Sequence, residues 1–279
     1  MIHVPPEFRT LSKRCRNYPK PGCKIEDFFY QKWVENRPSG IRRQYLPIFW
    51  THQYTRRVAK IKRMQQFINT INRSLVGPAF TIVQHADGIF QNKVPERVLV
   101  FGAGGVGDIP IPLIYEMPAS KPAPRITFAH FSGGFGRYND RTKVRSKMLL
   151  TLKNHEGFAI HNSLKGNQPV HETMQQCVFA LCPRGFGKTS FRLYEAMFYG
   201  AIPVYIYDDP WLPYTDILNW SEFSVQCHIS DIGRLPDILR NHTDADIRRK
   251  QQRLKEVVPE YFTLESTYHQ IIRTLREWP

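Results

Sequence analysis

Apolar and polar positions alternate along the second half of the chain in a repeated strand and helix pattern. Short apolar runs typical of buried parallel strands lie at 125–131, 157–161, 177–182, 202–207 and 223–228. Segments with apolar residues at helical spacing separate them, at 142–153, 170–176, 190–199, 213–218 and 232–240. This alternation predicts a parallel sheet with helices on both faces.

The first half is less regular but follows the same logic. Strands are predicted at 45–50, 80–84, 97–101 and 112–116, with a long amphipathic helix at 54–75. Closely spaced prolines between Met117 and Arg125 indicate a linker. We therefore expect two α/β domains, residues 1–120 and 121–279, and a final helix at 266–277 that packs on the second domain or crosses back to the first.

Composition is that of a folded globular chain. The 279 residues are 42% hydrophobic and 13% aromatic, which is enough for the cores of one large or two small domains. No run approaches the roughly 18 apolar residues of a membrane span, and the N-terminus lacks an apolar signal core. Five cysteines without a CxxC pair are expected to be free thiols. These features predict a soluble, cytoplasmic protein.

The net charge of +15 raises the question of a polyanionic partner. One run of cations, Arg56, Arg57, Lys60, Lys62 and Arg63, lies on the helix predicted at 54–75, where a solvated basic face is the simpler interpretation. Basic clefts also attract sugar nucleotides, whose diphosphate is negative. Charge alone therefore does not choose between these partners.

A glycine-rich segment, Gly102 to Gly107, follows a predicted strand and fits the G-x-G-x-x-G pattern of dinucleotide-binding proteins. That pattern has to open a helix, but Pro110 and Pro112 follow almost at once and forbid a regular one. We interpret the segment as a structural loop.

A second glycine-rich segment, Gly185 to Ser190, lies between a predicted buried strand and a helix. A complete phosphate-binding loop of an NTPase would need glycine where Cys182 stands. Thr189 and Ser190 at a helix N-terminus still leave free backbone N–H groups, which favour anion binding. The alternative is a helix capped by Ser190 with no ligand.

The helix that follows contains Arg192 and Glu195, which are three residues apart and share a face. Ligands of open α/β sheets bind at the carboxyl edge, where such a carboxylate reaches ribose hydroxyls and such a cation meets phosphate. A surface ion pair is the alternative.

Another candidate anion site is the loop from Ser132 to Arg137, directly after a predicted strand. Gly133 and Gly134 allow close backbone approach, and Arg137 can bind phosphate oxygens in a bidentate manner. Further cations follow: Arg141, Lys143 and Arg145. The alternative is a set of solvated loop cations.

From Arg125 to about Arg273 the sequence resembles the exostosin family of inverting, GT47-type glycosyltransferases. The resemblance is carried by the segments 179–185, 190–196, 200–204 and 208–220, with 223–225. It implies a GT-B architecture, in which two Rossmann-like domains face each other across a cleft and the second binds the nucleotide sugar. The chain is short for this family and is similar to the compact soluble forms of large algal viruses.

Within this resemblance, Glu195 is expected to bind the donor ribose, and Arg184 and Arg192 the diphosphate. The loop that begins with Asp208 and Asp209 would face the transferred sugar. Adjacent residues on an extended backbone point to opposite faces, so these two aspartates are poor ligands for one metal ion. We therefore expect no metal and no cofactor.

The general base is expected from the first domain. Residues 84–88 follow a strand and are similar to a His-Asp stretch of plant members. Asp87 is the predicted base and His85 the alternative. A turn-forming Asp-Gly pair beside a packed histidine remains the structural alternative.

The resulting function is transfer of a sugar from a UDP-sugar to a hydroxyl of an acceptor glycan, without a nucleic-acid partner. Xylose is the best guess for the sugar, while glucuronate, galactose and N-acetylglucosamine stay open. The alternative function is a polyanion- or nucleic-acid-binding module on a degenerate transferase scaffold.

Overall fold

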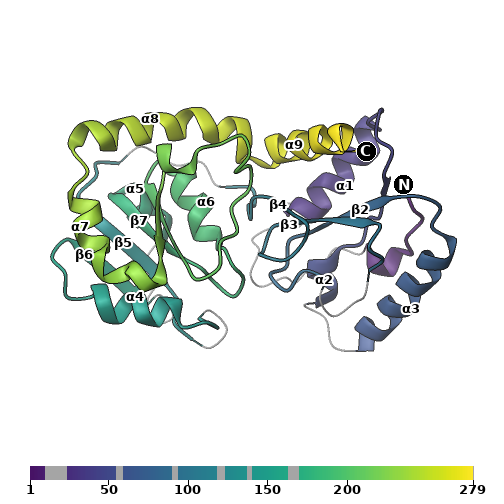
Figure 1. Cartoon of the computed structure of the whole chain (residues 1–279), viewed down its shortest axis with the longest axis horizontal. Coiled ribbons are helices and arrows are strands. Elements are labelled where there is room, and N and C mark those ends of the chain that lie inside the picture. Colours follow the sequence, from purple (N-terminus) through teal and green to yellow (C-terminus); the bar gives the residue numbers. More distant parts are fainter. Residues whose placement is uncertain are drawn as a thin grey trace. The chain divides into compact units, whose positions relative to one another are not determined.

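A computed structural model describes residues 1–9, 24–54, 59–89, 94–117, 123–136, 140–162 and 170–278 (Figure 1). The chain divides into two compact units. Unit 1 comprises Met1–Glu116 and Thr263–Pro279, and unit 2 comprises Met117–Phe262. Each unit contains one sheet whose paired strands are all parallel, so the predicted α/β class is confirmed.

The sheet of unit 2 has five strands in the order β6-β5-β7-β8-β9. Their bounds are β5 (Thr127–Gly133), β6 (Phe158–Asn162), β7 (Cys177–Pro183), β8 (Ile202–Tyr207) and β9 (Val225–His228). After β5 the chain builds β6 on one side, then returns to place β7 on the other side of β5. The strand order therefore reverses between β5 and β7.

Helices cover both faces of this sheet. They are α4 (Val144–Leu152), α5 (Val170–Gln175), α6 (Phe191–Phe198), α7 (Leu235–Arg240) and α8 (Asp244–Tyr261), with the 3-10 helices η3 (Trp220–Glu222) and η4 (Ile229–Arg234). Successive residues of β7 face opposite sides of the sheet. Because helices cover both sides, the strand is apolar throughout. Phe179 and Leu181 join the core formed with α4, η4 and α7, whereas Cys182 lies against α6.

Unit 1 has a four-stranded sheet in sequence order. The strands are β1 (Gln44–Tyr45), β2 (Ala79–Val83), β3 (Val98–Gly102) and β4 (Ile109–Pro110). The helices are α1 (Ile25–Asn36), α2 (Trp50–Tyr54), α3 (Ala59–Ser74) and α9 (Leu264–Glu277), with the 3-10 helix η1 (Pro6–Phe8). Although α9 follows unit 2 in the chain, it packs on α1.

Two apolar clusters hold the sheet of unit 1 between its helices. On one face, Trp50 of α2 and Met64 and Ile68 of α3 pack against β2 and β3. On the other face, an aromatic cluster links α1, α9 and the strands. Its ring contacts run through Phe29, Trp33, Tyr45, Phe80, Phe101 and Tyr268.

Several predicted elements differ from the structure. The strand predicted at 45–50 is wrong beyond Tyr45, because the chain turns into α2 at Trp50. The strand predicted at 112–116 is wrong, and the short β4 at Ile109–Pro110 takes its place in the sheet. Turns occupy the helix predicted at 213–218, and α8 was not predicted at all.

Other expectations fare better. Cys177, Cys182 and Cys227 are buried free thiols, while Cys15 and Cys23 lie outside the described residues. Within the ranges that the structure describes, no helix has the length and apolar character needed to cross a bilayer.

Candidate functional site

The strand order of the unit 2 sheet reverses between β5 and β7, which defines a topological switch point at the carboxyl edge of the sheet. In open α/β sheets such a switch point is where ligands bind, because the loops on its two sides turn away from each other. Gly133 and Gly134 stand at the end of β5, and Arg184 directly follows β7. These site residues, which were predicted separately from the sequence, therefore lie at the same edge of the sheet.

Arg145, on the first turn of α4, links the segments that follow β5 and β7 at this switch point. Its guanidinium donates hydrogen bonds to the carbonyl of Gly134 (2.9 Å) and, through Nε, to the carbonyl of Arg184 (3.0 Å). Burial and the nearby charge of Arg192 lower the pKa of Arg145 to about 10, so it stays protonated at neutral pH. Sequence reasoning named Arg145 only as one of several cations after the glycine loop.

Gly133 is required by packing rather than by an unusual backbone angle. A Cβ at this position would lie 2.6 Å from Cζ of Phe131, whose ring is fully buried. Arg137, predicted to bind phosphate here, lies outside the described residues.

Arg184 is fixed by an ion pair with Asp208, which follows the neighbouring strand β8. Their closest atoms are 2.5 Å apart, and Arg184 Nε also donates to the carbonyl of Gly187 (2.9 Å). Burial alone would raise the pKa of Asp208, but hydrogen bonds from Arg184 and Thr142 and the Arg184 charge hold it below its usual value. The carboxylate is therefore ionised and orients the guanidinium.

The adjacent Asp209 has a different partner. Its carboxylate lies 2.8 Å from Nζ of Lys188, and that ammonium sits over the ring of Trp211 at 5.4 Å. The hydroxyl of Tyr205 donates to the Lys188 carbonyl and accepts from the Trp211 backbone N–H. These contacts tie the loop after β8 to the loop after β7.

The N-terminus of α6 opens toward the same edge. Ser190 occupies the N-cap position with extended backbone angles, as predicted, but its hydroxyl makes no capping hydrogen bond. The hydroxyls of Thr189, Ser190 and Ser132 are all buried and lack a hydrogen-bond partner among the described residues. Leaving three such groups unpaired is costly, which is typical of a site awaiting a polar ligand.

Arg192 and Glu195 form the predicted pair on the first turns of α6. Their closest atoms are 2.9 Å apart, and the side chains are only 18% and 10% exposed. A pair this buried is not a typical surface ion pair. It places one cation and one carboxylate beside the unpaired hydroxyls of the helix N-terminus.

In unit 1, His85 and Asp87 form a half-buried turn after β2. The backbone N–H of Asp87 donates to Nδ1 of His85 at 3.1 Å, so a neutral His85 carries its proton on Nε2. Burial lowers the pKa of His85. Gly88 ends the turn with a φ of +57°, a left-handed conformation that favours glycine.

The glycine-rich loop after β3 supports this turn. A Cβ at Gly104 would lie 2.4 Å from Cα and 2.6 Å from N of Ala86, so only glycine permits the approach. No helix follows the loop, which agrees with the sequence argument against a dinucleotide site. The G-x-G-x-x-G spacing here serves backbone packing.

Glu26 was not anticipated from the sequence and lies directly behind the same turn. The residue is 3% exposed, and its carboxylate accepts hydrogen bonds from the backbone N–H groups of Gln84 (2.8 Å) and Thr51. The Thr51 hydroxyl donates to it as well, at 2.7 Å. Burial raises the pKa of Glu26 to about 7.

Comparison with known proteins agrees with the resemblance seen in the sequence. Residues 105–242 match the family model described as "Exostosin GT47 domain". The fold thus defines an α/β protein with two parallel sheets, as a GT-B architecture requires. Residues 105–242 are thus similar to an exostosin-type GT47 domain, and the resemblance stated from the sequence motifs is confirmed.

Relatives named for two sugars match about half of the chain. "Probable glucuronosyltransferase" of Oryza sativa subsp. japonica is 35% identical over 54% of this chain and 38% of its own length. "Probable beta-1,4-xylosyltransferase" of Arabidopsis thaliana is 32% identical over 54% of this chain and 40% of its own. The chain thus spans about two fifths of these curated relatives.

Among solved structures, that of TarM is similar with a TM-score of 0.46 and 14% identity, over 78% of this chain and 46% of that one. The part of the chain that the structure describes contains no group of three or more His, Cys, Asp or Glu side chains arranged to hold a metal ion.

Proposed function

We propose that the chain is a glycosyltransferase that moves a sugar from a UDP-sugar to a hydroxyl of an acceptor glycan. The observation that carries the proposal is the set of three buried, unpaired hydroxyls at the N-terminus of α6 and the end of β5, flanked by arginines at the switch point of the sheet. The exostosin GT47 match and the names of the relatives support it.

The donor diphosphate would bind at the N-terminus of α6. The hydroxyls of Thr189 and Ser190 and the dipole of the helix favour an anion there. Arg184 and Arg192 add positive charge, and Gly133 and Gly134 let the backbone approach. Glu195 is suited to accept hydrogen bonds from ribose hydroxyls.

The loop that begins with Asp208 and Asp209 would contact the transferred sugar. Carboxylates accept hydrogen bonds from sugar hydroxyls, but both are already paired with cations, Asp208 with Arg184 and Asp209 with Lys188. The charge of this loop therefore does not choose between xylose and glucuronate, and xylose is proposed from the similarity to a relative named as a xylosyltransferase. The names of the relatives include both activities, so a direct comparison of the two donors is part of the test.

Chemistry would proceed with inversion at the anomeric carbon. The acceptor oxygen attacks that carbon, its O–H proton passes to the Asp87 carboxylate, and the bond to UDP breaks so that UDP leaves with the electron pair. His85 is the alternative base. The mechanism requires that the turn of unit 1 reach the donor held by unit 2.

Stabilisation of the departing diphosphate would come from the α6 N-terminus and the arginines. We therefore propose that turnover needs no metal ion. Activity measured with EDTA and with added Mn²⁺ tests this: equal rates support it, and a rate that depends on Mn²⁺ contradicts it.

The function is tested by calorimetry and thermal shift with UDP, GDP, UDP-xylose and UDP-glucuronate. We expect UDP and one UDP-sugar to raise the melting temperature, because they bind only the folded state. Glu195→Gln should abolish the effect, whereas Glu265→Gln, an exposed carboxylate on α9, should preserve it. If no nucleotide changes the melting temperature or gives a binding signal, and polyanions bind in a salt-sensitive manner, the binding-module alternative is favoured instead.

A further inference from the structure

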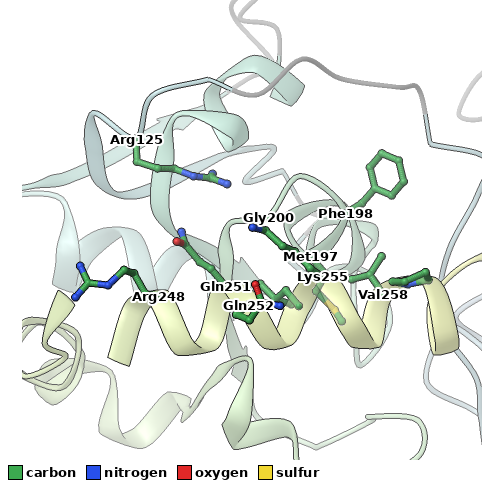
Figure 2. Close-up of a pocket in the computed structure, with 11 residues that line it drawn as sticks. Arg125, Met197, Phe198, Gly200, Arg248, Gln251, Gln252, Lys255 and Val258 are labelled. Carbon is green, nitrogen blue, oxygen red and sulfur yellow. The ribbon is translucent and has the colours of Figure 1, made fainter. Parts of the chain in front are cut away.

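A pocket lies at the C-terminal end of α6, within unit 2. It has a volume of about 620 Å³ and is enclosed by the C-terminal end of α6, the residues before β5 and one face of α8. Figure 2 shows Arg125 and Phe198 across the pocket from α8, with Gln251 pointing from α8 toward Arg125. The size is in the range of small-ligand sites.

The cations of α8 differ according to the face they occupy. Arg249, Lys250 and Arg253 point elsewhere and are partnered: Arg249 with Asp246, Arg253 with Glu222 and Glu256, and Lys250 with backbone carbonyls. Arg248 and Lys255 line the pocket, and neither has an ion pair or hydrogen bond among the described residues. The unpaired positive charge of this helix is therefore gathered at the pocket.

Among the described residues, none of those that line the pocket is acidic and could offset this charge. Arg125 adds a third cation, whose guanidinium is held by the carbonyls of Met174, Cys177 and Tyr199 at 2.8 to 2.9 Å. Since carbonyls carry no net charge, the pocket remains positive. A carboxylate or other anion would enter it favourably.

The spacing of the polar groups indicates an extended ligand. Arg248 and Lys255 are seven residues apart on one face of α8, or about 10 Å along the helix axis. Gln251 and Gln252 lie between them, and amides bind hydroxyls as donors and as acceptors. Phe198, which is 38% exposed, offers an apolar ring at the rim. A single phosphate would instead favour cations that converge on one point.

We propose that this pocket binds an acidic oligosaccharide, with Arg248 and Lys255 on successive carboxylates and the two glutamines on hydroxyls between them. The choice of a glycan rests on the proposed function, while the need for negative charge rests on the pocket alone. Because the pocket lies at the opposite end of α6 from Ser190, it would hold a charged stretch of glycan away from the reacting sugar.

The test measures binding of a fluorescent hexamer of galacturonic acid to the full chain at fixed ionic strength, with cellohexaose as the neutral competitor. The Arg248→Gln/Lys255→Gln double variant should lose affinity by about tenfold or more, equivalent to two charge-assisted contacts. The matched control is Arg249→Gln/Arg253→Gln, which removes the same charge from the same helix and should change affinity by less than about twofold.

Three results would overturn the inference. Equal losses of hexamer affinity in both double variants would mean a diffuse charge effect. Equally tight binding of cellohexaose, or tighter binding of an oligonucleotide of equal charge through Arg248 and Lys255, would contradict the choice of an acidic oligosaccharide. Binding of UDP is measured on the same samples and should be unaffected by either variant. A chain that binds the galacturonate hexamer but not UDP would contradict the proposed function and leave the pocket standing as an anion site.

Discussion

The carboxylate of Glu26 accepts a hydrogen bond of 2.8 Å from the backbone N–H of Gln84, the residue directly before the turn that carries His85 and Asp87. Thr51 donates to the same carboxylate through its backbone and its hydroxyl. One buried acid therefore joins α1, the start of α2 and the end of β2. A change in its protonation acts on the segment proposed to hold the general base.

The first prediction concerns stability and pH. Because burial raises the pKa of Glu26 from 4.5 to about 7, the folded state binds more protons than the unfolded state between these values. This group's contribution to the free energy of unfolding should fall as pH rises from 4.5 to 7, by on the order of 3 kcal/mol at most. Denaturant unfolding across this range should show the slope in the parent chain and not in Glu26→Gln.

The control for that slope is Glu256→Gln. This carboxylate is exposed, and a hydrogen bond from Arg253 lowers its pKa, so it titrates below the window. Its variant should keep the parent slope. A Glu26→Gln profile parallel to that of the parent would contradict the assignment.

A second prediction concerns the contact between the glycine-rich loop and the His85 turn. Gly104→Ala should destabilise the chain by about 2 kcal/mol or more, because the new methyl group overlaps the backbone of Ala86. Gly233→Ala is the control, since a Cβ there meets nothing within 4 Å. Unfolding measurements that find the two substitutions equally mild would show that the loop does not support the turn.

A third prediction separates stability from ligand binding at the α6 N-terminus. Ser190→Ala removes an unpaired buried hydroxyl, so it should leave stability unchanged or slightly higher. UDP affinity should fall by about fivefold to tenfold, which is about 1 kcal/mol for a lost hydrogen bond.

Ser224→Ala is the matched variant for this test. Its buried hydroxyl donates to the Trp220 carbonyl at 2.6 Å, so its loss should lower stability and spare UDP binding. If calorimetry shows undiminished UDP affinity in Ser190→Ala, the hydroxyl does not contact the donor.

A fourth prediction concerns the proposed base. Asp87→Asn should reduce kcat by about 10² to 10⁴-fold with little change in UDP binding, because only proton removal is lost. His85→Gln should cost less. The assay is sugar transfer from the donor identified by calorimetry, and a larger loss in His85→Gln than in Asp87→Asn would reverse the two roles.

Strongly patterned elements of the fold were predictable from the sequence. The run at 202–207 is apolar, is bounded by glycine and aspartate, and forms β8 with the same bounds. The helix α8 escaped prediction because its buried residues are few and include a lysine, Lys250, whose ammonium is satisfied by backbone carbonyls. Apolar periodicity cannot signal a helix that buries a polar side chain in this way.

The sequence predicted the position of the candidate site where polar residues come soon after a predicted strand, as Arg184, Ser190 and Asp208 do. The supporting contacts were not, since Arg145 and Glu26 act on backbone groups distant in the sequence. Tertiary structure brings these partners together, so the spacing of nearby residues in the sequence does not predict their contacts. The placement of Gly104 against Ala86 is of the same kind.

The division of unit 1 into two stretches of chain has a consequence for the order of folding. Tyr268 of α9 completes the aromatic cluster around Phe29, yet it is synthesised after every residue of unit 2. During synthesis unit 2 can fold as a continuous segment. The aromatic cluster of unit 1 stays exposed to water or to chaperones until α9 has been synthesised. The unit proposed to carry the base is thus the last to mature, and no half-made chain should be catalytically competent.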